Sequence, residues 1–166
     1  MVTPAPLARG SVPESRLKAA LLSKFPQFVD WPGPAIEGRP TLDVCVAAPD
    51  PFGADLQELL TGEQVNARPL ALRHVATAAD VDGCHLLYLP AQGYARHPPL
   101  LGAVADRPVL TVSDAPNFLD DGGMVALRVV GDRVRFDIDA AAARRVGLRI
   151  SSQLLRLAVS VRGGRA

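Results

Sequence analysis

Two cysteines and three histidines carry the most versatile side chain chemistry in this sequence. Cys45 lies in the apolar stretch LDVCVAA, and Cys84 opens the apolar stretch CHLLYLP. Neither cysteine belongs to a C-x-x-C motif, the spacing typical of redox and zinc sites. The residue types alone leave two readings open. The cysteines are either two inert buried thiols, or a disulfide that persists only in an oxidising compartment.

The histidines give no sign of a metal site. His74, His85 and His97 lie in different segments, and no pair has the i, i+4 spacing that places two ligands on one helical face. A zinc site would need ligands gathered from scattered strands. We therefore predict that the protein has no metal site and no cofactor.

Ser113 and Asp114, in the stretch TVSDAP, lie where a predicted parallel strand ends. Ligands of open α/β sheets bind outside the carboxyl ends of such strands, so both residues are candidates for a ligand-binding cleft. The alternative is that both side chains cap the next turn through bonds to the backbone. Because the sequence contains neither a G-x-S-x-G motif nor a phosphate-binding loop, we predict no catalytic residue and no enzyme activity.

The segments that must position these residues read as short buried strands alternating with helices. Helical spacing begins near Glu14 and ends before Pro26, with Leu17, Ala20 and Leu21 on one face. The stretch from Phe25 to Pro34 is rich in aromatics and prolines and predicts a turn against the core. Apolar and β-branched runs predict strands over residues 41–48, 68–75, 84–90 and 107–114.

The second half of the chain adds a hairpin and two helical pieces. Alternating residues over 124–139 predict two antiparallel strands that turn at Gly131 and Asp132. A helix over 54–60 is expected to be capped by Asp50, and a helix over 140–159 is expected to break near Gly147. The predicted fold is α/β: a single-domain layered sandwich with a mixed, mainly parallel sheet and a C-terminal β-hairpin followed by helices.

The composition indicates one globular domain. The chain has 166 residues, 48% of them hydrophobic, and a formal net charge of +1, so we expect no nucleic acid partner. Its apolar runs are too short to span a membrane. We expect a flexible tail over residues 1–13 and the domain over 14–162. The first residues lack the apolar region of a signal peptide, so the chain is either cytosolic or begins after a removed export signal.

Several ordered blocks of this sequence resemble the YfiR-like family. The opening block, KAALLSKFPQFVDWP, matches the family motif at Lys18, Ala19, Ala20, Phe25, Phe28, Trp31 and Pro32. The stretches VCVAAPDPFG, VNARPLALR and GCHLLYLP resemble later blocks, and LTVSDAP to ISSQLLRLA resembles the longest one. The sequence departs from the family pattern at Ala67, Val125, Ala126, Asp139 and Arg149.

The resemblance implies a function based on binding. YfiR-like proteins are exported to the periplasm, where the best-known ones repress the membrane diguanylate cyclase YfiN through its periplasmic sensor domain. The resemblance also implies a homodimer, a removed export signal and a disulfide between Cys45 and Cys84, which fall at family cysteine positions. Phe25, Phe28 and Trp31 are candidates for partner contact. The alternative function is a small-molecule-binding domain with its cleft near Ser113 and Asp114.

Overall fold

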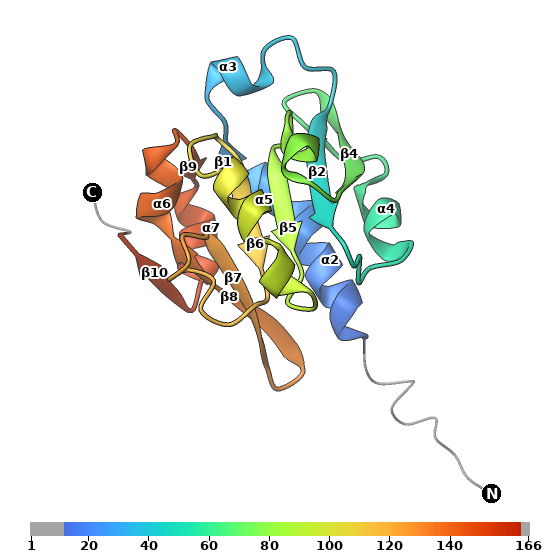
Figure 1. The fold of residues 1–166 in the computed structure, drawn as a ribbon, viewed down its shortest axis with the longest axis vertical. Coiled ribbons are helices and arrows are strands. Elements are labelled where there is room, and N and C mark those ends of the chain that lie inside the picture. Colours follow the sequence, from blue (N-terminus) through green and yellow to red (C-terminus); the bar gives the residue numbers. More distant parts are fainter. Residues whose placement is uncertain (1–11, 164–166) are drawn as a thin grey trace, which may run out of the picture.

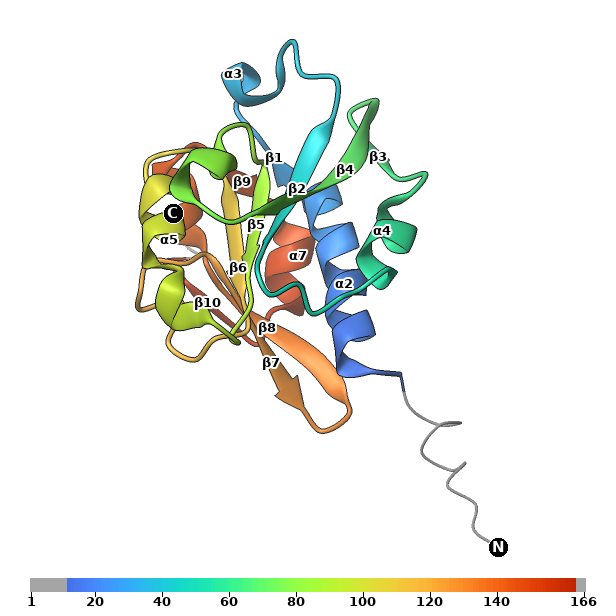
Figure 2. The ribbon, with the colours of Figure 1, turned by 45° about the vertical axis from the view of Figure 1, so that its right-hand side comes forward.

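The computed structural model describes residues 12–163, and these form helices packed on both faces of a mixed sheet (Figures 1 and 2). The predicted α/β sandwich is confirmed. The predicted tail over residues 1–13 lies outside the described residues except for its last two positions. Among the described residues, none of the helices has both the length and the apolar character needed to cross a membrane.

The main sheet has eight strands in the order β10-β8-β7-β6-β5-β2-β4-β3. Neighbouring strands are parallel except in the pairs β7–β8 and β3–β4. The strands are β2 (Leu42–Ala47), β3 (Gln64–Val65), β4 (Arg68–Val75), β5 (Leu86–Leu89), β6 (Leu110–Ser113), β7 (Val125–Val130), β8 (Arg133–Asp139) and β10 (Ser160–Arg162).

Two hydrophobic cores follow from the alternation of side chains along these strands. On β2, Val44 and Val46 face one core, whereas Cys45 and Ala47 face the other. Helices α2 (Glu14–Lys24), α4 (Asp55–Leu60) and α7 (Ser152–Leu157) cover the first face. The opposite face carries η2 (Ala78–Val81), η3 (Tyr94–Arg96) and α5 (Pro98–Ala103).

The remaining elements are short. They are η1 (Phe25–Phe28), β1 (Val29–Asp30), α3 (Gly33–Ile36), α6 (Ala140–Arg145) and β9 (Arg149–Ile150). β1 and β9 pair antiparallel and form a separate two-stranded sheet. This pairing ties the segment after η1 to the segment after α6, although the two are far apart in the sequence.

Helix α2 buries a different face from the one predicted. The structure buries Lys18, Ala19 and Leu22, and leaves Leu17 and Ala20 half-buried. The reason is Lys18, whose ammonium group is paired inside the molecule and therefore belongs to the buried face. A prediction based on apolar spacing places every lysine in solvent, and it therefore predicts the wrong buried face for α2.

Asp50 does not cap α4 as predicted. One carboxylate oxygen accepts a hydrogen bond from the Phe52 backbone N–H at 2.6 Å, and the other lies 2.6 Å from His74 Nε2. Asp50 therefore shapes the turn between β2 and α4. Ser151, in contrast, caps α7, because its hydroxyl accepts from the N–H groups of Gln153 and Leu154.

Candidate functional site

The strand order places the expected ligand crevice at the carboxyl ends of β2 and β5. From β2 the chain moves outward to β4, then returns to the other side of β2 for β5 and continues to β6. The order of the sheet therefore reverses between β2 and β5. Ligands of open α/β sheets bind at such a reversal, outside the carboxyl ends of the strands.

Only one of the two predicted ligand residues faces this crevice. Ser113 is fully buried at the end of β6. Its hydroxyl donates to the Leu89 carbonyl at 2.5 Å and accepts from the Ala115 N–H at 2.9 Å. The side chain thus stabilises the turn, which was the alternative reading of this motif. Asp114, the next residue, lines the crevice.

Asp114 links three separate parts of the chain. Its Oδ1 accepts from the Ala91 N–H at 2.7 Å, in the loop that follows β5. Its Oδ2 lies 2.6 Å from Lys18 Nζ on α2. Lys18 also pairs with Glu14, one helical turn earlier. The Lys18 and Asp114 side chains are 8% and 18% exposed, so this ion pair is largely shielded from water.

Both members of the pair are held in their charged forms. Burial by itself raises the pKa of Asp114, but the hydrogen bonds from Lys18 and the Ala91 N–H outweigh it and lower the pKa. Burial by itself lowers the pKa of Lys18, but the bonds to Asp114 and Glu14 outweigh it and raise the pKa. The crevice therefore contains a fixed cation between two carboxylates.

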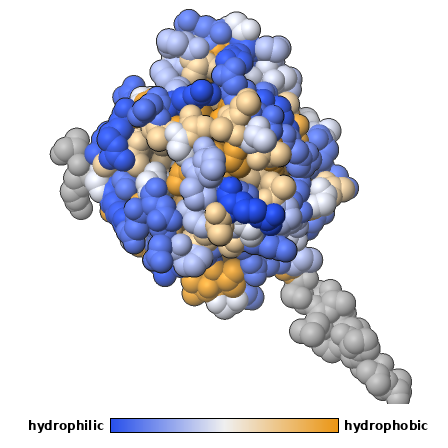
Figure 3. All heavy atoms as spheres, in the orientation of Figure 1, coloured by the Kyte–Doolittle hydropathy of each residue, from blue (hydrophilic) through white to orange (hydrophobic). Residues whose placement is uncertain are grey.

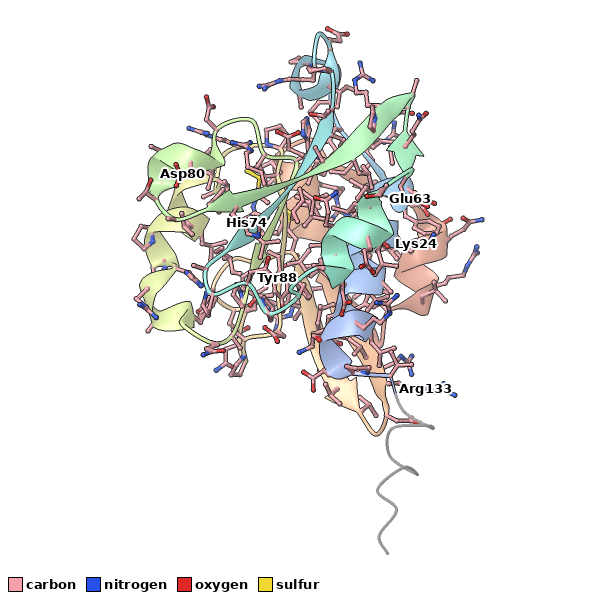
Figure 4. All side chains as sticks on the ribbon, turned by 90° about the vertical axis from the view of Figure 1, so that its right-hand side faces the viewer. Lys24, Glu63, His74, Asp80, Tyr88 and Arg133 are labelled. Atoms are coloured by element: carbon pink, nitrogen blue, oxygen red, sulfur yellow. A yellow bond between two sulfur atoms is a disulfide. The ribbon has the colours of Figure 1, made fainter. Side chains whose placement is uncertain are left out.

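A cavity of about 160 Å³ opens beside this cluster. Its walls come from α2, from the turns after β2 and β5, and from Tyr88 and Asp114. Tyr88 is fully buried, and its hydroxyl lies close to the Asp114 carboxylate but makes no hydrogen bond of good geometry among the described residues. Figure 4 shows Tyr88 in the interior of the molecule. Burial, followed by the nearby Asp114 carboxylate, raises the pKa of Tyr88, so the hydroxyl keeps its proton.

Sequence reasoning missed Lys18 and Tyr88. Lys18 is 96 residues from Asp114 in the sequence, and no local sequence pattern indicates that the two side chains are in contact. Tyr88 lies in an apolar strand and looks like a core residue. Its position two residues before the strand's exit proline was the available signal, because side chains at that end of a parallel strand border the ligand crevice.

A second, larger cavity of about 620 Å³ lies near α5 and α6. Two of its polar side chains, Tyr94 and Thr111, already have hydrogen-bond partners. The Tyr94 hydroxyl donates to Asp121 at 2.8 Å, and the Thr111 hydroxyl accepts from the Met124 N–H at 3.0 Å. None of the residues that line this larger cavity has a buried polar atom left unpaired within residues 12–163, so we regard the smaller cavity as the stronger candidate.

The two cysteines form a disulfide, as the family resemblance implied. Cys45 on β2 and Cys84, just before β5, have Cα atoms 6.0 Å apart. β2 and β5 are adjacent parallel strands, which brings these positions together. Cys45 is fully buried and Cys84 is 5% exposed, with Arg73 donating to the Cys84 sulfur at 3.5 Å. The bridge lies in the core on the side of the sheet opposite α2.

The aromatic residues proposed for partner contact are mostly inside the molecule. Phe25 is fully buried and packs edge-on against Phe136, with ring centroids 5.3 Å apart. Trp31 is 5% exposed, and its indole N–H donates to the His85 carbonyl at 3.1 Å. Phe28 is half-buried. Burial removes Phe25 and Trp31 from the surface that a partner can reach, so their predicted role does not fit this structure.

His85 is a buried link between β2 and α3. Its Nδ1 accepts from the Asp43 N–H at 2.9 Å, so the ring proton resides on Nε2, which donates to the Ala35 carbonyl at 2.9 Å. A second proton would destroy the first bond. Burial lowers the pKa of His85, outweighing the bond to Ala35, and keeps the ring neutral.

We expect this histidine to make the fold sensitive to mild acid. Below about pH 6.5 the unfolded chain binds a proton at this position that the folded chain does not. The free energy of unfolding should then fall, by up to about 1.4 kcal/mol per pH unit, until the lowered pKa is reached. Above about pH 6.5, where the histidine is neutral in both the folded and the unfolded chain, the full contribution is present. Urea unfolding at several pH values measures the slope.

The matched control for this prediction is His85→Gln, whose amide can accept from Asp43 and donate to Ala35 without titrating. His97, whose pKa is also lowered by burial and by Arg96, remains in both proteins and contributes equally. The variant should show a shallower decline in stability with acid. An identical decline in both proteins would show that His85 is not responsible.

Within residues 12–163, no group of three or more histidine, cysteine or carboxylate side chains is placed to hold a metal ion.

Comparisons with known proteins agree with the fold and define the family. A conserved domain protein from Vibrio cholerae O1 biovar El Tor strain N16961 has a similar crystal structure, with a TM-score of 0.56 and 12% identity. The match covers 92% of the present chain but only 61% of that protein, and at this identity it shows the fold alone.

The family assignment comes from the sequence profile. The profile described as YfiR/HmsC-like matches residues 15–159, which is most of the chain. That range contains α2, the disulfide, Asp114 and the C-terminal hairpin. The chain therefore belongs to the YfiR/HmsC-like family.

Proposed function

We propose that this protein is a periplasmic regulator that binds the sensor domain of an inner-membrane, YfiN-like diguanylate cyclase and represses it. Repression would lower cyclic di-GMP and biofilm formation. The observation that carries the proposal is the family match over residues 15–159. The disulfide supports a location outside the cytoplasm, because such bonds persist in oxidising compartments. In keeping with the family resemblance, we further propose that the protein is a homodimer.

Binding rather than catalysis is also what the side chains support. The Ser113 hydroxyl is engaged in two hydrogen bonds, and both cysteines are in the bridge, so neither offers a free nucleophile. A thiol oxidoreductase would need an exposed thiolate of low pKa. We therefore propose that the protein is not an enzyme and acts by docking.

An exposed apolar surface near the β7–β8 hairpin is the place where we expect the partner to dock. Figure 3 shows an apolar patch at the lower end of the molecule, where Figure 1 draws this hairpin. A surface depression here is lined partly by Glu14, Asp132 and Arg133. Its apolar side is formed by Val129, which is 48% exposed, and by Leu17, Val134 and Val12. These four residues form what we call the hairpin patch. Exposed apolar groups that gather in one place are typical of binding surfaces.

Expression of the exported protein in cells that carry the cyclase tests the proposal. We expect cellular cyclic di-GMP to fall severalfold when the protein is present in the periplasm. Val129→Asp, which places a charge in the hairpin patch, should abolish this fall. Leu157→Asp is the matched control, since Leu157 is 59% exposed and lies on α7 outside the patch. Unchanged cyclic di-GMP with folded periplasmic protein would contradict the proposal.

The second candidate function is small-molecule binding at Asp114. The specific observation that favours it is the cavity at the sheet reversal, which is lined by Asp114 and the unpartnered Tyr88 hydroxyl. The two functions are compatible, because a ligand that prefers one conformation would bias the binding of a partner.

A further inference from the structure

The cavity beside Asp114 has the size of a very small ligand. Its volume is about 160 Å³. An apolar cavity of about 150 Å³ in another protein holds benzene, which has six non-hydrogen atoms. The space between α2, the Pro51–Phe52 turn and the loop that follows β5 thus fits a molecule of similar size.

The Tyr88 hydroxyl is the feature of this cavity that calls for a partner. It is fully buried, and although the Asp114 carboxylate is close, it makes no hydrogen bond of good geometry among the residues that the structure describes. Buried hydroxyls in folded proteins are nearly always paired, since an unpaired one loses its bonds to water without replacement. A bound molecule that reaches Tyr88 would supply the missing bond.

The charges around the cavity favour a neutral molecule. The Lys18 ammonium donates to Glu14 and Asp114 and retains a third N–H. An incoming anion would meet two carboxylates, and an incoming cation would meet Lys18. A hydroxyl group avoids both conflicts, because it can accept from Lys18 or Tyr88 and donate to a carboxylate oxygen.

The other walls suit a carbon chain. Phe52 packs against Tyr88 with ring centroids 5.1 Å apart, and Pro51 and Pro90 complete an apolar side. From these observations we infer that the cavity binds a small uncharged polyol, with its hydroxyls on Tyr88 and the Lys18 cluster. This inference rests on the second candidate function above, that the cleft at Asp114 takes a ligand, and it names the ligand's chemical class.

Three probes of equal size test the class. Glycerol, lactate and serinol each have six non-hydrogen atoms and are neutral, anionic and cationic at neutral pH. Each is titrated into the intact ¹⁵N-labelled protein, and the amide signals of Ala91 and Gln92 are followed. We expect saturable shifts with glycerol at millimolar concentrations and weaker or linear shifts with the other two.

Two variants locate the site. Tyr88→Phe removes an unpaired hydroxyl and should fold normally, but it should weaken glycerol binding roughly fivefold, the equivalent of one hydrogen bond. Ala91→Leu fills the cavity and should abolish the saturable shifts. Tighter binding of lactate or serinol would overturn the polyol assignment while leaving the cleft in place. Linear shifts with all three probes would overturn the cleft as well.

Discussion

Replacing both Cys45 and Cys84 with alanine is expected to lower the free energy of unfolding by about 4 kcal/mol. The bridge joins positions 39 residues apart. Cross-linking a loop of that length removes chain entropy from the unfolded state, which corresponds to about 4 kcal/mol in the loop-entropy model. For a chain of this size the midpoint of thermal unfolding should fall by about 8–16 °C. Thermal and urea unfolding measure both quantities.

The single variants and a reductant serve as controls. Cys45→Ala or Cys84→Ala alone breaks the same bridge, so each should cost nearly as much as the double variant. Reductant should destabilise the wild type and leave the double variant unchanged. Additive losses in the two single variants, or no effect of reductant on the wild type, would contradict a stabilising role for the bridge.

Lys18→Met is expected to destabilise the protein by about 3 kcal/mol, because it leaves the shielded Asp114 carboxylate without its cation. Asp114→Asn should cost less, because Lys18 keeps Glu14 as a partner. The pair joins α2 to the end of β6 and, through the Ala91 N–H, to the loop after β5. Its loss should also loosen the crevice, which faster hydrogen exchange at Ala91 would reveal.

Glu14→Gln is the matched control for the Lys18 prediction. Glu14 bonds to the same ammonium group, but its side chain is 56% exposed, so its removal should cost less than about 1 kcal/mol. The double variant Lys18→Met with Asp114→Asn should cost clearly less than the sum of the two single variants. Equal effects of Lys18→Met and Glu14→Gln would show that burial does not set the strength of this pair.

The sequence predicted the elements whose signals are local. The hairpin over 124–139 was found from alternation and from Gly131 and Asp132 at its turn, and the structure pairs Val130 with Arg133 across that turn. The strands at 42–47, 68–75 and 110–113 were found from apolar and β-branched runs. Each of these patterns lies within a single stretch of about ten residues.

The elements that were missed depend on distant partners. β1 and β9 have two residues each and exist because Val29 pairs with Ile150 and Asp30 with Arg149. β10 likewise forms against β8. Segments this short have no periodicity to detect, and the contacts that create them become visible only once the chain is folded.

Only part of the candidate site could be predicted from the sequence. Asp114, predicted from the end of a parallel strand, lines the cavity, and its role in ligand binding stays a prediction. Ser113, its neighbour, points into the fold and stabilises a turn. Lys18 could not be placed, because a buried lysine violates the apolar pattern on which the helix prediction rests. Phe25 and Trp31 show the converse, since large aromatic residues that suggest an interface fill the core instead.

Direct binding to the cyclase is the most decisive measurement. The oxidised protein is titrated by calorimetry into the purified periplasmic domain of a YfiN-like diguanylate cyclase. We predict saturable binding that is lost in Val129→Asp and retained in Leu157→Asp. A flat titration with folded, disulfide-bonded protein and a folded sensor domain would contradict the proposed function.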